Sequence, residues 1–346
     1  MVQNLTGSLL GRYQLDELLG SGIMGSVYRA TDLSLERPVA VKVLLDDAFG
    51  SFGIRFQREA RALAKLEHVN ILPIYDLGKD NQNAYIVMKF IPGGSLHNAM
   101  TIRSLGWPLC LAMLRQIAAA LDYAHSQGVI HRDLKPSNVL LESSDTCLLT
   151  DFGLAKLADS DEQQTAAGAI FGTPAYMAPE QGMNASLVSP ATDNYALGLI
   201  AYRMAAGRLP FEGVPMQILG EKNFNDPVAP SKFNPSINRI ADSVFLKAIA
   251  RAPEQRYASA TVFVSALGDV LPTLTPAPQQ AEEHDLQSTI VLGNDAVGSS
   301  KGPSIFFASS SVRHSVVKDS LDFIKYDWAR STGRSRTWCD RHIAYG

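Results

Sequence analysis

The stretch that decides the fold is HRDLKPSN at residues 131–138, followed by DFG at residues 151–153. It supplies a carboxylate at Asp133 close to a lysine, and two further oxygen ligands at Asn138 and Asp151. A proton acceptor, a cation and oxygen ligands suited to Mg²⁺ are the groups needed to move a phosphoryl group from a nucleotide to a hydroxyl. We therefore test the rest of the chain against a hypothesis of phosphoryl transfer.

The composition is typical of a globular protein. With 346 residues, 46% of them hydrophobic, the chain can bury a sizeable core. The net charge of -3 gives no overall attraction to polyanions, so we expect no nucleic-acid partner. We find no signal-peptide pattern and no apolar run of about 18 residues, so we expect a cytoplasmic protein without a transmembrane segment. Cys110, Cys147 and Cys339 lack the spacing of a metal site or a disulfide framework.

The first part of the chain predicts a small antiparallel sheet that carries one helix. Five short runs rich in β-branched and aromatic residues are typical of strands. They cover residues 13–19, 26–31, 39–44, 71–77 and 85–88. Between the third and fourth runs, Phe56, Ala60, Leu63 and Leu66 share one helical face, which predicts the helix.

Beyond a Pro-Gly-Gly turn at residues 92–94, the pattern changes to helices. Leu109, Met113 and Ile117 recur every four residues and predict the first of them. Further helices are expected over residues 192–206, 214–221, 240–251 and 259–270. Gly207 is a natural C-cap for the helix that precedes it.

The remaining sequence is rich first in proline and glutamine and then in serine and glycine, which indicates a linker and a weakly ordered tail. We therefore expect an N-terminal extension at residues 1–12, one folded domain at residues 13–271 and a tail at residues 272–346. Within the domain, the sheet lobe covers residues 13–91 and the helical lobe residues 92–271.

A glycine-rich loop, GSGIMGSV at residues 20–27, lies between the first two predicted strands. Its glycines allow a hairpin backbone to close over phosphates without Cβ obstruction. A similar pattern occurs at strand-to-helix turns of dinucleotide-binding folds, but here Val27 and Tyr28 continue as a strand. Taken alone, the loop is also compatible with an ordinary glycine hairpin.

Lys42 ends the apolar run VAVK at residues 39–42, so it must reach water or find an anion. Glu59, on the inward side of the predicted helix, is a natural partner, and an ion pair between them would hold Lys42 near nucleotide phosphates. A solvated position for Glu59 remains an equal alternative, because the helix has other charged residues.

These motifs follow one another in a fixed order and end with APE at residues 178–180. Over residues 13–270 the chain resembles the eukaryotic-like serine/threonine protein kinases, above all their bacterial branch. The resemblance implies an α+β, bilobed fold: a small antiparallel sheet lobe with one helix, and a larger, mainly helical lobe. It also implies ATP and Mg²⁺ as cofactors and proteins with serine or threonine acceptors as partners.

The resemblance assigns roles to individual residues. Asp133 would take or orient the proton of the acceptor hydroxyl, while Asn138 and Asp151 would hold Mg²⁺. Lys135 would meet the γ-phosphate and a threonine such as Thr173, as in serine/threonine-specific members. The implied nucleotide site comprises Leu19, Gly20, Ser21, Gly22, Gly25, Val27, Ala40, Lys42, Glu59, Met88, Lys89, Ile91 and Leu140.

The segment from Asp151 to Glu180 resembles an activation loop, because it is long and has little periodicity. Arg132 would pair with a phosphate carried by Thr165 or Thr173, and a transient homodimer would allow autophosphorylation. A plain surface threonine is an equal alternative for Thr165.

Other matching residues are expected to be structural. His131 and Phe152 would pack with Leu63 and Tyr75 in an apolar column between the lobes. Asp193 would anchor the catalytic loop, and Glu180 would form an ion pair with Arg256. His125 is also read as structural.

One position departs from the family, since Lys89 stands where relatives usually carry glutamate. Backbone groups of Lys89 and Ile91 would bind the adenine edge, so nucleotide binding should survive the loss of a local ion pair at this position.

The sequence leaves two rivals to a protein kinase. A pseudokinase scaffold would have lost the lysine, the base or the metal aspartate, whereas Lys42, Asp133 and Asp151 are all present. A small-molecule kinase is disfavoured by Lys135 and by the segment at residues 172–180. The sequence therefore favours a serine/threonine protein kinase.

Overall fold

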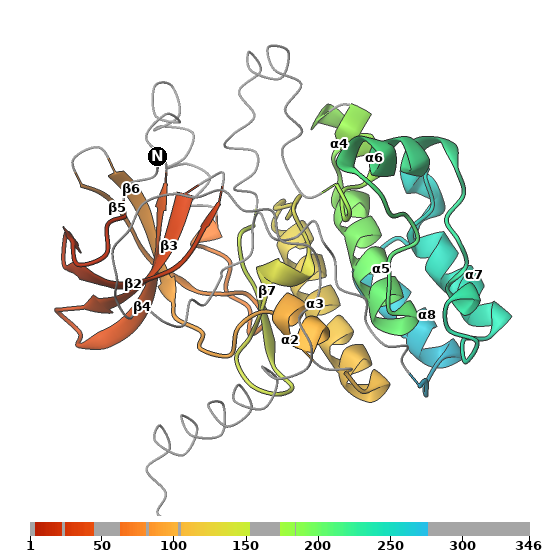
Figure 1. Cartoon of the computed structure of the whole chain (residues 1–346), viewed down its shortest axis with the longest axis horizontal. Helices are drawn as coiled ribbons and strands as arrows, with labels where there is room; N and C mark the ends of the chain where they lie inside the picture. The colour runs from red at the N-terminus through yellow and green to blue at the C-terminus, as the bar shows by residue number, and fades with distance from the viewer. Residues whose placement is uncertain are drawn as a thin grey trace, which may run out of the picture. The chain divides into compact units, whose positions relative to one another are not determined.

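The computed structural model describes residues 4–22, 25–44, 63–80, 83–102, 105–152, 174–183 and 185–275. Its N-terminal lobe is a six-stranded antiparallel sheet in the order β1-β2-β3-β4-β6-β5 (Figure 1). The strands are β1 (Leu9–Leu10), β2 (Tyr13–Gly22), β3 (Gly25–Asp32), β4 (Arg37–Leu44), β5 (Ile74–Asp80) and β6 (Asn83–Lys89). The five predicted strands are thus present, and β1 adds a short edge strand before them.

Strand β4 is buried on both faces, and the alternation of its side chains separates two environments. Val39, Val41 and Val43 enter an apolar cluster confined to the sheet lobe. Ala40 lies on the opposite face and belongs to the larger core that continues into the helical lobe. Because side chains alternate along a strand, Lys42 shares the face of Ala40, which explains how a lysine lies within an apolar run.

The hairpin between β2 and β3 requires a glycine at Gly25. Its φ of +144° is a conformation that other residues rarely adopt, and a Cβ there would lie 2.1 Å from the carbonyl oxygen of Val43. The backbone of the loop therefore approaches β4 more closely than a residue with a side chain would allow.

Another glycine, Gly93, lets the chain cross closely from the sheet lobe to the helical lobe. A Cβ at this position would lie 2.0 Å from the carbonyl oxygen of Leu141. The next residue, Gly94, accepts a hydrogen bond from the Leu141 backbone N–H at 2.9 Å. Any larger residue at Gly93 would push this connection away from Leu141.

The helical lobe contains a small two-stranded sheet and the helices shown from orange to blue in Figure 1. Its elements are α2 (Leu96–Ile102), α3 (Trp107–Ser126), β7 (Val139–Leu141), β8 (Cys147–Leu149), α4 (Pro179–Met183), α5 (Pro190–Ala206), α6 (Pro215–Phe224), α7 (Arg239–Ala248) and α8 (Ala260–Val270). All the predicted helices of this lobe are found, each within four residues of its expected ends. Gly207 adopts the left-handed conformation that ends α5 (φ +80°), as predicted.

Helix α5 is the centre of this lobe, because every residue from Thr192 to Ala206 is buried. Helix α8 packs on α3, and hydrogen bonds hold it at both ends. The Asp122 carboxylate of α3 accepts from the Ala260 and Thr261 N–H groups at 2.9 Å each. The Trp107 indole donates to the Leu271 carbonyl at 2.6 Å, just beyond the end of α8.

Within the described ranges, no helix is long and apolar enough to cross a membrane. Cys110 and Cys147 are buried as free thiols, as the sequence predicted, and burial raises the pKa of each to about 12. Cys339 lies outside the described residues.

The predicted ion pair between Glu180 and Arg256 is confirmed as a buried, two-pronged contact. The two guanidinium nitrogens donate to the two carboxylate oxygens at 2.7 and 2.8 Å. The Thr192 hydroxyl also donates to Glu180, at 3.0 Å. Since Thr192 belongs to α5 and Glu180 to α4, this contact fixes α4 onto the centre of the lobe.

Replacing Glu180 by glutamine is expected to lower the free energy of unfolding by about 3–5 kcal/mol, because it leaves a buried guanidinium without its carboxylate. Glu212→Gln is the matched control. Glu212 pairs with Arg208 at the surface, where such a pair contributes about 0–1 kcal/mol. Urea unfolding measures both losses, and similar values for the two variants would contradict the expectation.

The same pair should make stability depend on acid pH. Burial alone would raise the pKa of Glu180, but the hydrogen bonds from Arg256 outweigh it and hold this pKa below its ordinary value of 4.5. A carboxylate with a lowered folded pKa stabilises the protein at higher pH, and this stability is lost as the pH falls through that pKa. The stability difference between the unmodified protein and Glu180→Gln should therefore shrink between about pH 5 and pH 3, as measured by urea unfolding.

Candidate active site

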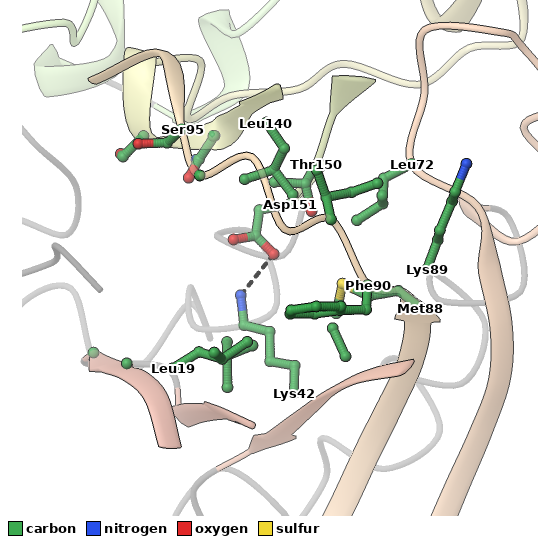
Figure 2. A pocket seen from close by; sticks show the side chains of 18 of the residues that line it. Leu19, Lys42, Leu72, Met88, Lys89, Phe90, Ser95, Leu140, Thr150 and Asp151 are labelled. Carbon is green, nitrogen blue, oxygen red and sulfur yellow. Dashed lines mark hydrogen bonds and ion pairs between the residues drawn. The ribbon is translucent and has the colours of Figure 1, made fainter. Parts of the chain in front are cut away.

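Lys42 and Asp151 meet across the boundary between the two lobes. The Lys42 Nζ lies 2.7 Å from Asp151 Oδ1, with Lys42 on β4 and Asp151 just beyond β8 (Figure 2). Burial alone would raise the pKa of Asp151, but the Lys42 charge outweighs it and holds that pKa below its ordinary value. Asp151 is therefore a carboxylate at neutral pH.

A cavity of about 220 Å³ opens around this pair, between the sheet lobe and the helical lobe. Its wall contains the predicted nucleotide-site residues Leu19, Gly20, Ser21, Gly22, Gly25, Val27, Ala40, Lys42, Met88, Lys89, Ile91 and Leu140. The sheet register explains part of this set, since Val27 pairs with Lys42 and Ala40 with Met88 on neighbouring strands. The cavity is mainly apolar, with charge concentrated at the end where Lys42 and Asp151 meet.

The edge of the cavity offers a backbone donor at Ile91, whose N–H donates no hydrogen bond within the described residues. By contrast, the Lys89 N–H donates to the Pro73 carbonyl at 3.1 Å, so only the Lys89 carbonyl is left for a ligand at that residue. One acceptor followed two residues later by one donor matches the edge of an adenine ring.

The Lys89 side chain forms an ion pair with Glu142, which follows β7 in the helical lobe. In Figure 2 its ammonium points away from Lys42 and Asp151. The loss of the ion pair that relatives form at this position stays a prediction. Lys89 itself finds a partner from the other lobe, because the close crossing at Gly93 brings the end of β6 next to the end of β7.

Asp133 lies in the loop between α3 and β7, held by two residues of the same stretch. Lys135 Nζ lies 3.1 Å from Asp133 Oδ2. The Asn138 amide donates to the Asp133 backbone carbonyl at 2.8 Å and to Oδ2 at 3.2 Å. Asp133 and Lys135 do not line the cavity around Lys42 and Asp151, whereas Asn138 does. The loop therefore presents its carboxylate beside the cavity.

The loop takes its shape from Asp193 on α5, a carboxylate that is 1% exposed. Asp193 accepts from the His131 and Arg132 N–H groups at 2.8 and 2.9 Å, and the His125 Nε2 lies 2.7 Å from it. Arg132 has a φ of +68°, a strained conformation for a residue with a side chain. Gln181 donates to the Arg132 carbonyl at 2.8 Å, so both sides of the strained residue are held. The anchoring role predicted for Asp193 is confirmed.

His131 and Phe152 pack together as predicted, with ring centroids 4.6 Å apart and both side chains buried. Leu63 is buried in the same core. The prediction that Tyr75 joins this apolar column is wrong. Its side chain is 39% exposed and stacks with Arg37, whose guanidinium carbon lies 4.1 Å from the ring centre. Since side chains alternate along β5, the neighbouring Ile74 takes the inward place.

The donor set fits a hard cation such as Mg²⁺. Because the Asn138 Nδ2 donates to Asp133, its Oδ1 is left without a hydrogen bond in the described residues, and so is the Asp151 oxygen that Lys42 does not hold. Among the described residues, no group of three acidic, histidine or cysteine side chains is placed to hold a metal ion by itself. Mg²⁺ is commonly held by one or two protein oxygens together with substrate phosphates, so two oxygens are a sufficient protein share.

Glu59, Thr165 and Thr173 lie outside the described residues, as do Gly153 and most of the predicted helix around Phe56. The predicted pairing of Lys42 with Glu59 and the contact of Lys135 with Thr173 therefore stay predictions. Residues 276–346 of the expected tail also lie outside.

Sequence reasoning did not identify eight further residues of the cavity wall. They are Leu72, Phe90, Pro92, Gly94, Ser95, Asn98, Ser137 and Thr150. Several stand next to predicted residues, such as Thr150 beside Asp151, and adjacency was a usable signal. Ser95 and Asn98 had no such signal, because only the packing of α2 brings its first turn to the cavity.

The fold and this site define the class of the protein. A family model described as the protein kinase domain matches residues 13–269. In structure, the chain is similar to the kinase domain of PknI from Mycobacterium tuberculosis, with a TM-score of 0.62 and 32% identity. That match covers 78% of this chain and 99% of the PknI chain. The chain therefore belongs to the protein kinase family.

Its relatives lie in the bacterial serine/threonine branch of this family. The chain is 40% identical to serine/threonine-protein kinase Pkn1 of Myxococcus xanthus, over 76% of this chain and 39% of Pkn1. It is 35% identical to PknB of Mycobacterium tuberculosis, over 85% of this chain and 48% of PknB, and 36% identical to PrkC of Bacillus subtilis, over 72% and 39%. The chain thus spans half or less of the length of these curated relatives.

The ion pair between Lys89 and Glu142 predicts a charge-swap result. Lys89→Glu should lower the free energy of unfolding by up to about 1 kcal/mol, because it places two carboxylates together at a half-exposed site. Exchanging both residues, Lys89→Glu with Glu142→Lys, should restore most of that loss. Urea unfolding measures the stabilities, and a double variant no more stable than Lys89→Glu would contradict a direct pair.

Proposed function

We propose that this chain transfers the γ-phosphate of ATP to serine or threonine hydroxyls of proteins. The contact of Lys42 with Asp151, on the wall of a largely apolar cavity, is the observation that carries the proposal. It brings a cation for phosphates from one lobe to a metal-binding carboxylate from the other. The neighbouring loop adds a carboxylate suited to deprotonate an acceptor.

The nucleotide occupies the cavity in this proposal. Its adenine ring lies between Val27 and Ala40 on one side and Leu140 on the other. The Lys89 carbonyl and the Ile91 N–H bind the adenine edge. Lys42 binds the α- and β-phosphates, and Glu59 holds Lys42 in place.

In the chemical step, the acceptor oxygen forms a bond to the γ-phosphorus while the bond from that phosphorus to the β,γ-bridging oxygen breaks, and this oxygen leaves as part of ADP. Asp133 receives the hydroxyl proton. Lys135, 3.1 Å from Asp133 in the structure, neutralises charge on the phosphoryl group in transit. Asn138 and Asp151 hold Mg²⁺, which supplies charge neutralisation at the phosphates.

The acceptor is serine or threonine in this proposal, because Lys135 and Thr173 match the subclass specific for these residues. Arg132 makes no side-chain hydrogen bond or ion pair within the described residues, which leaves it available for a phosphate on the activation segment. We therefore retain autophosphorylation at Thr165 or Thr173, through a transient homodimer, as a means of activation.

The kinase domain in this proposal spans residues 13–271, with the lobes meeting between Ile91 and Pro92. The chain works in the cytoplasm, where ATP is supplied. Residues 272–346 are assigned no part in the reaction.

The proposal is tested by transfer of ³²P from labelled ATP to the protein itself and to dephosphorylated casein. Asp133→Asn should slow transfer by about 10²- to 10⁴-fold, the effect typical of removing a positioned base. Lys42→Met should also abolish most transfer, whereas Lys79→Met, at an exposed position of the same sheet, should leave it unchanged.

The outcomes separate the alternatives. Mg-ATP binding without any incorporation would favour a pseudokinase scaffold. Transfer to small hydroxyl compounds but not to casein or to the chain itself would favour a small-molecule kinase. Phosphatase-treated protein that keeps its full initial rate would contradict activation by autophosphorylation.

A further inference from the structure

Lys222 on α6 is a buried lysine that binds three backbone carbonyls of one short segment. Its side chain belongs to a residue only 2% exposed. The Nζ donates to the carbonyls of Pro174, Ala175 and Met177 at 2.8, 2.7 and 2.8 Å. These residues lie just before α4, at the end of the activation segment. One side chain thus gathers three carbonyls that are close in sequence.

This contact is unusual because no carboxylate shares it. Within the described residues Lys222 forms no salt bridge, and its other neighbour is the face of Tyr195, whose ring centre lies 5.5 Å from Nζ. Burial lowers the pKa of Lys222 well below its usual range. The three carbonyls oppose that shift, because an ammonium has three N–H groups and a neutral amine only two. An apolar side chain would fill the same space without a desolvation penalty, so packing alone does not account for a lysine here.

The segment that Lys222 gathers is connected to the catalytic loop. Gln181 accepts from the Ala178 N–H at 2.9 Å and donates to the Arg132 carbonyl at 2.8 Å, next to Asp133. A second buried contact holds the segment against α5, where Arg203 donates to the Tyr176 hydroxyl at 2.8 Å. Several contacts therefore set the position of residues 174–178 relative to Asp133. Lys222 contributes the most hydrogen bonds among them, with three.

The same segment stands apart from the nucleotide site. None of the described residues 174–183 lines the cavity around Lys42 and Asp151. A protein acceptor must reach Asp133 from a side that the nucleotide does not fill. The segment before α4 is joined through Gln181 of α4 to the residue preceding Asp133, so it borders that approach.

We propose that Lys222 is a positioning residue for the protein acceptor: by binding the carbonyls of Pro174, Ala175 and Met177, it fixes the segment on which the acceptor lies beside Asp133. The proposal rests on the kinase activity proposed above. It assigns Lys222 no contact with ATP and no part in proton transfer. Loss of Lys222 should therefore weaken use of the protein acceptor and spare use of the nucleotide.

The test is steady-state phosphorylation of dephosphorylated casein, with casein and Mg-ATP varied independently. Lys222→Met keeps the length of the side chain but removes all three donors. Its KM for casein should rise about tenfold, because the segment that positions the acceptor loses the hydrogen bonds from Lys222. Its KM for Mg-ATP should stay within about twofold of the unmodified value. Lys222→Gln, which retains two N–H donors, should give an intermediate KM for casein.

Lys232→Met is the matched control, because Lys232 is an exposed lysine of the same lobe and the described structure gives it no ion pair. Its kinetic constants should equal those of the unmodified chain. Thermal unfolding and Mg-ATP binding are measured on every variant. If Lys222→Met does not fold, Lys222→Gln decides the outcome.

Hydrogen exchange gives a readout independent of catalysis. Amides of residues 174–183 should exchange about tenfold faster in Lys222→Met, while those of β7 and β8 stay unchanged. An unchanged KM for casein in a folded Lys222→Met variant would overturn the proposal, and so would equal losses for casein and Mg-ATP. If the unmodified chain phosphorylates nothing, the proposed function fails. Faster exchange confined to residues 174–183 then supports only the holding of this segment by Lys222, and the role toward an acceptor falls with the proposed function. Unchanged exchange overturns both.

Discussion

The rest of the structure depends on the hydrogen bonds that the Asp193 carboxylate accepts from two backbone N–H groups. This side chain is buried, on a helix that is itself buried along most of its length, so water cannot donate hydrogen bonds to it. The His131 and Arg132 N–H groups supply the missing hydrogen bonds and hold Arg132 in a strained conformation. Because Asp133 follows directly, the position of the candidate base is set by the core of the helical lobe rather than by its own loop.

A second constraint joins the lobes. The Lys42 side chain leaves one face of β4, while valines from the other face form the separate core of the sheet lobe. The contact with Asp151 therefore depends on two packed cores meeting at one boundary. The close crossing at Gly93 and the pair of Lys89 with Glu142 reinforce that boundary at its far edge. In the proposed function, nucleotide affinity and stability are consequently linked, because the same contacts shape the cavity and hold the lobes together.

Much of the site was predictable because its residues come in short, dense motifs. Asp133, Lys135 and Asn138 lie within six residues, so they must be close in space whatever the fold. Strand alternation likewise explains why Ala40 and Lys42 face the same cavity. Reasoning from the resemblance failed at Tyr75, where a shift in the pairing of β5 with β6 accompanies the change of face, and Ile74 points inward instead. It also missed Ser95 and Asn98, because nothing local marks the first turn of α2 as part of the cavity.

The sequence by itself determined the family, the order of strands and helices and the identity of the chemical groups, since these depend on local patterns and on motifs whose spacing is short. Only the tertiary structure decided which distant groups meet. The partner of Lys89 is 53 residues away, at Glu142, and the carbonyls bound by Lys222 begin 48 residues before it. A buried charge must find whatever donors or acceptors the packing brings to it, and no local pattern encodes which ones those are.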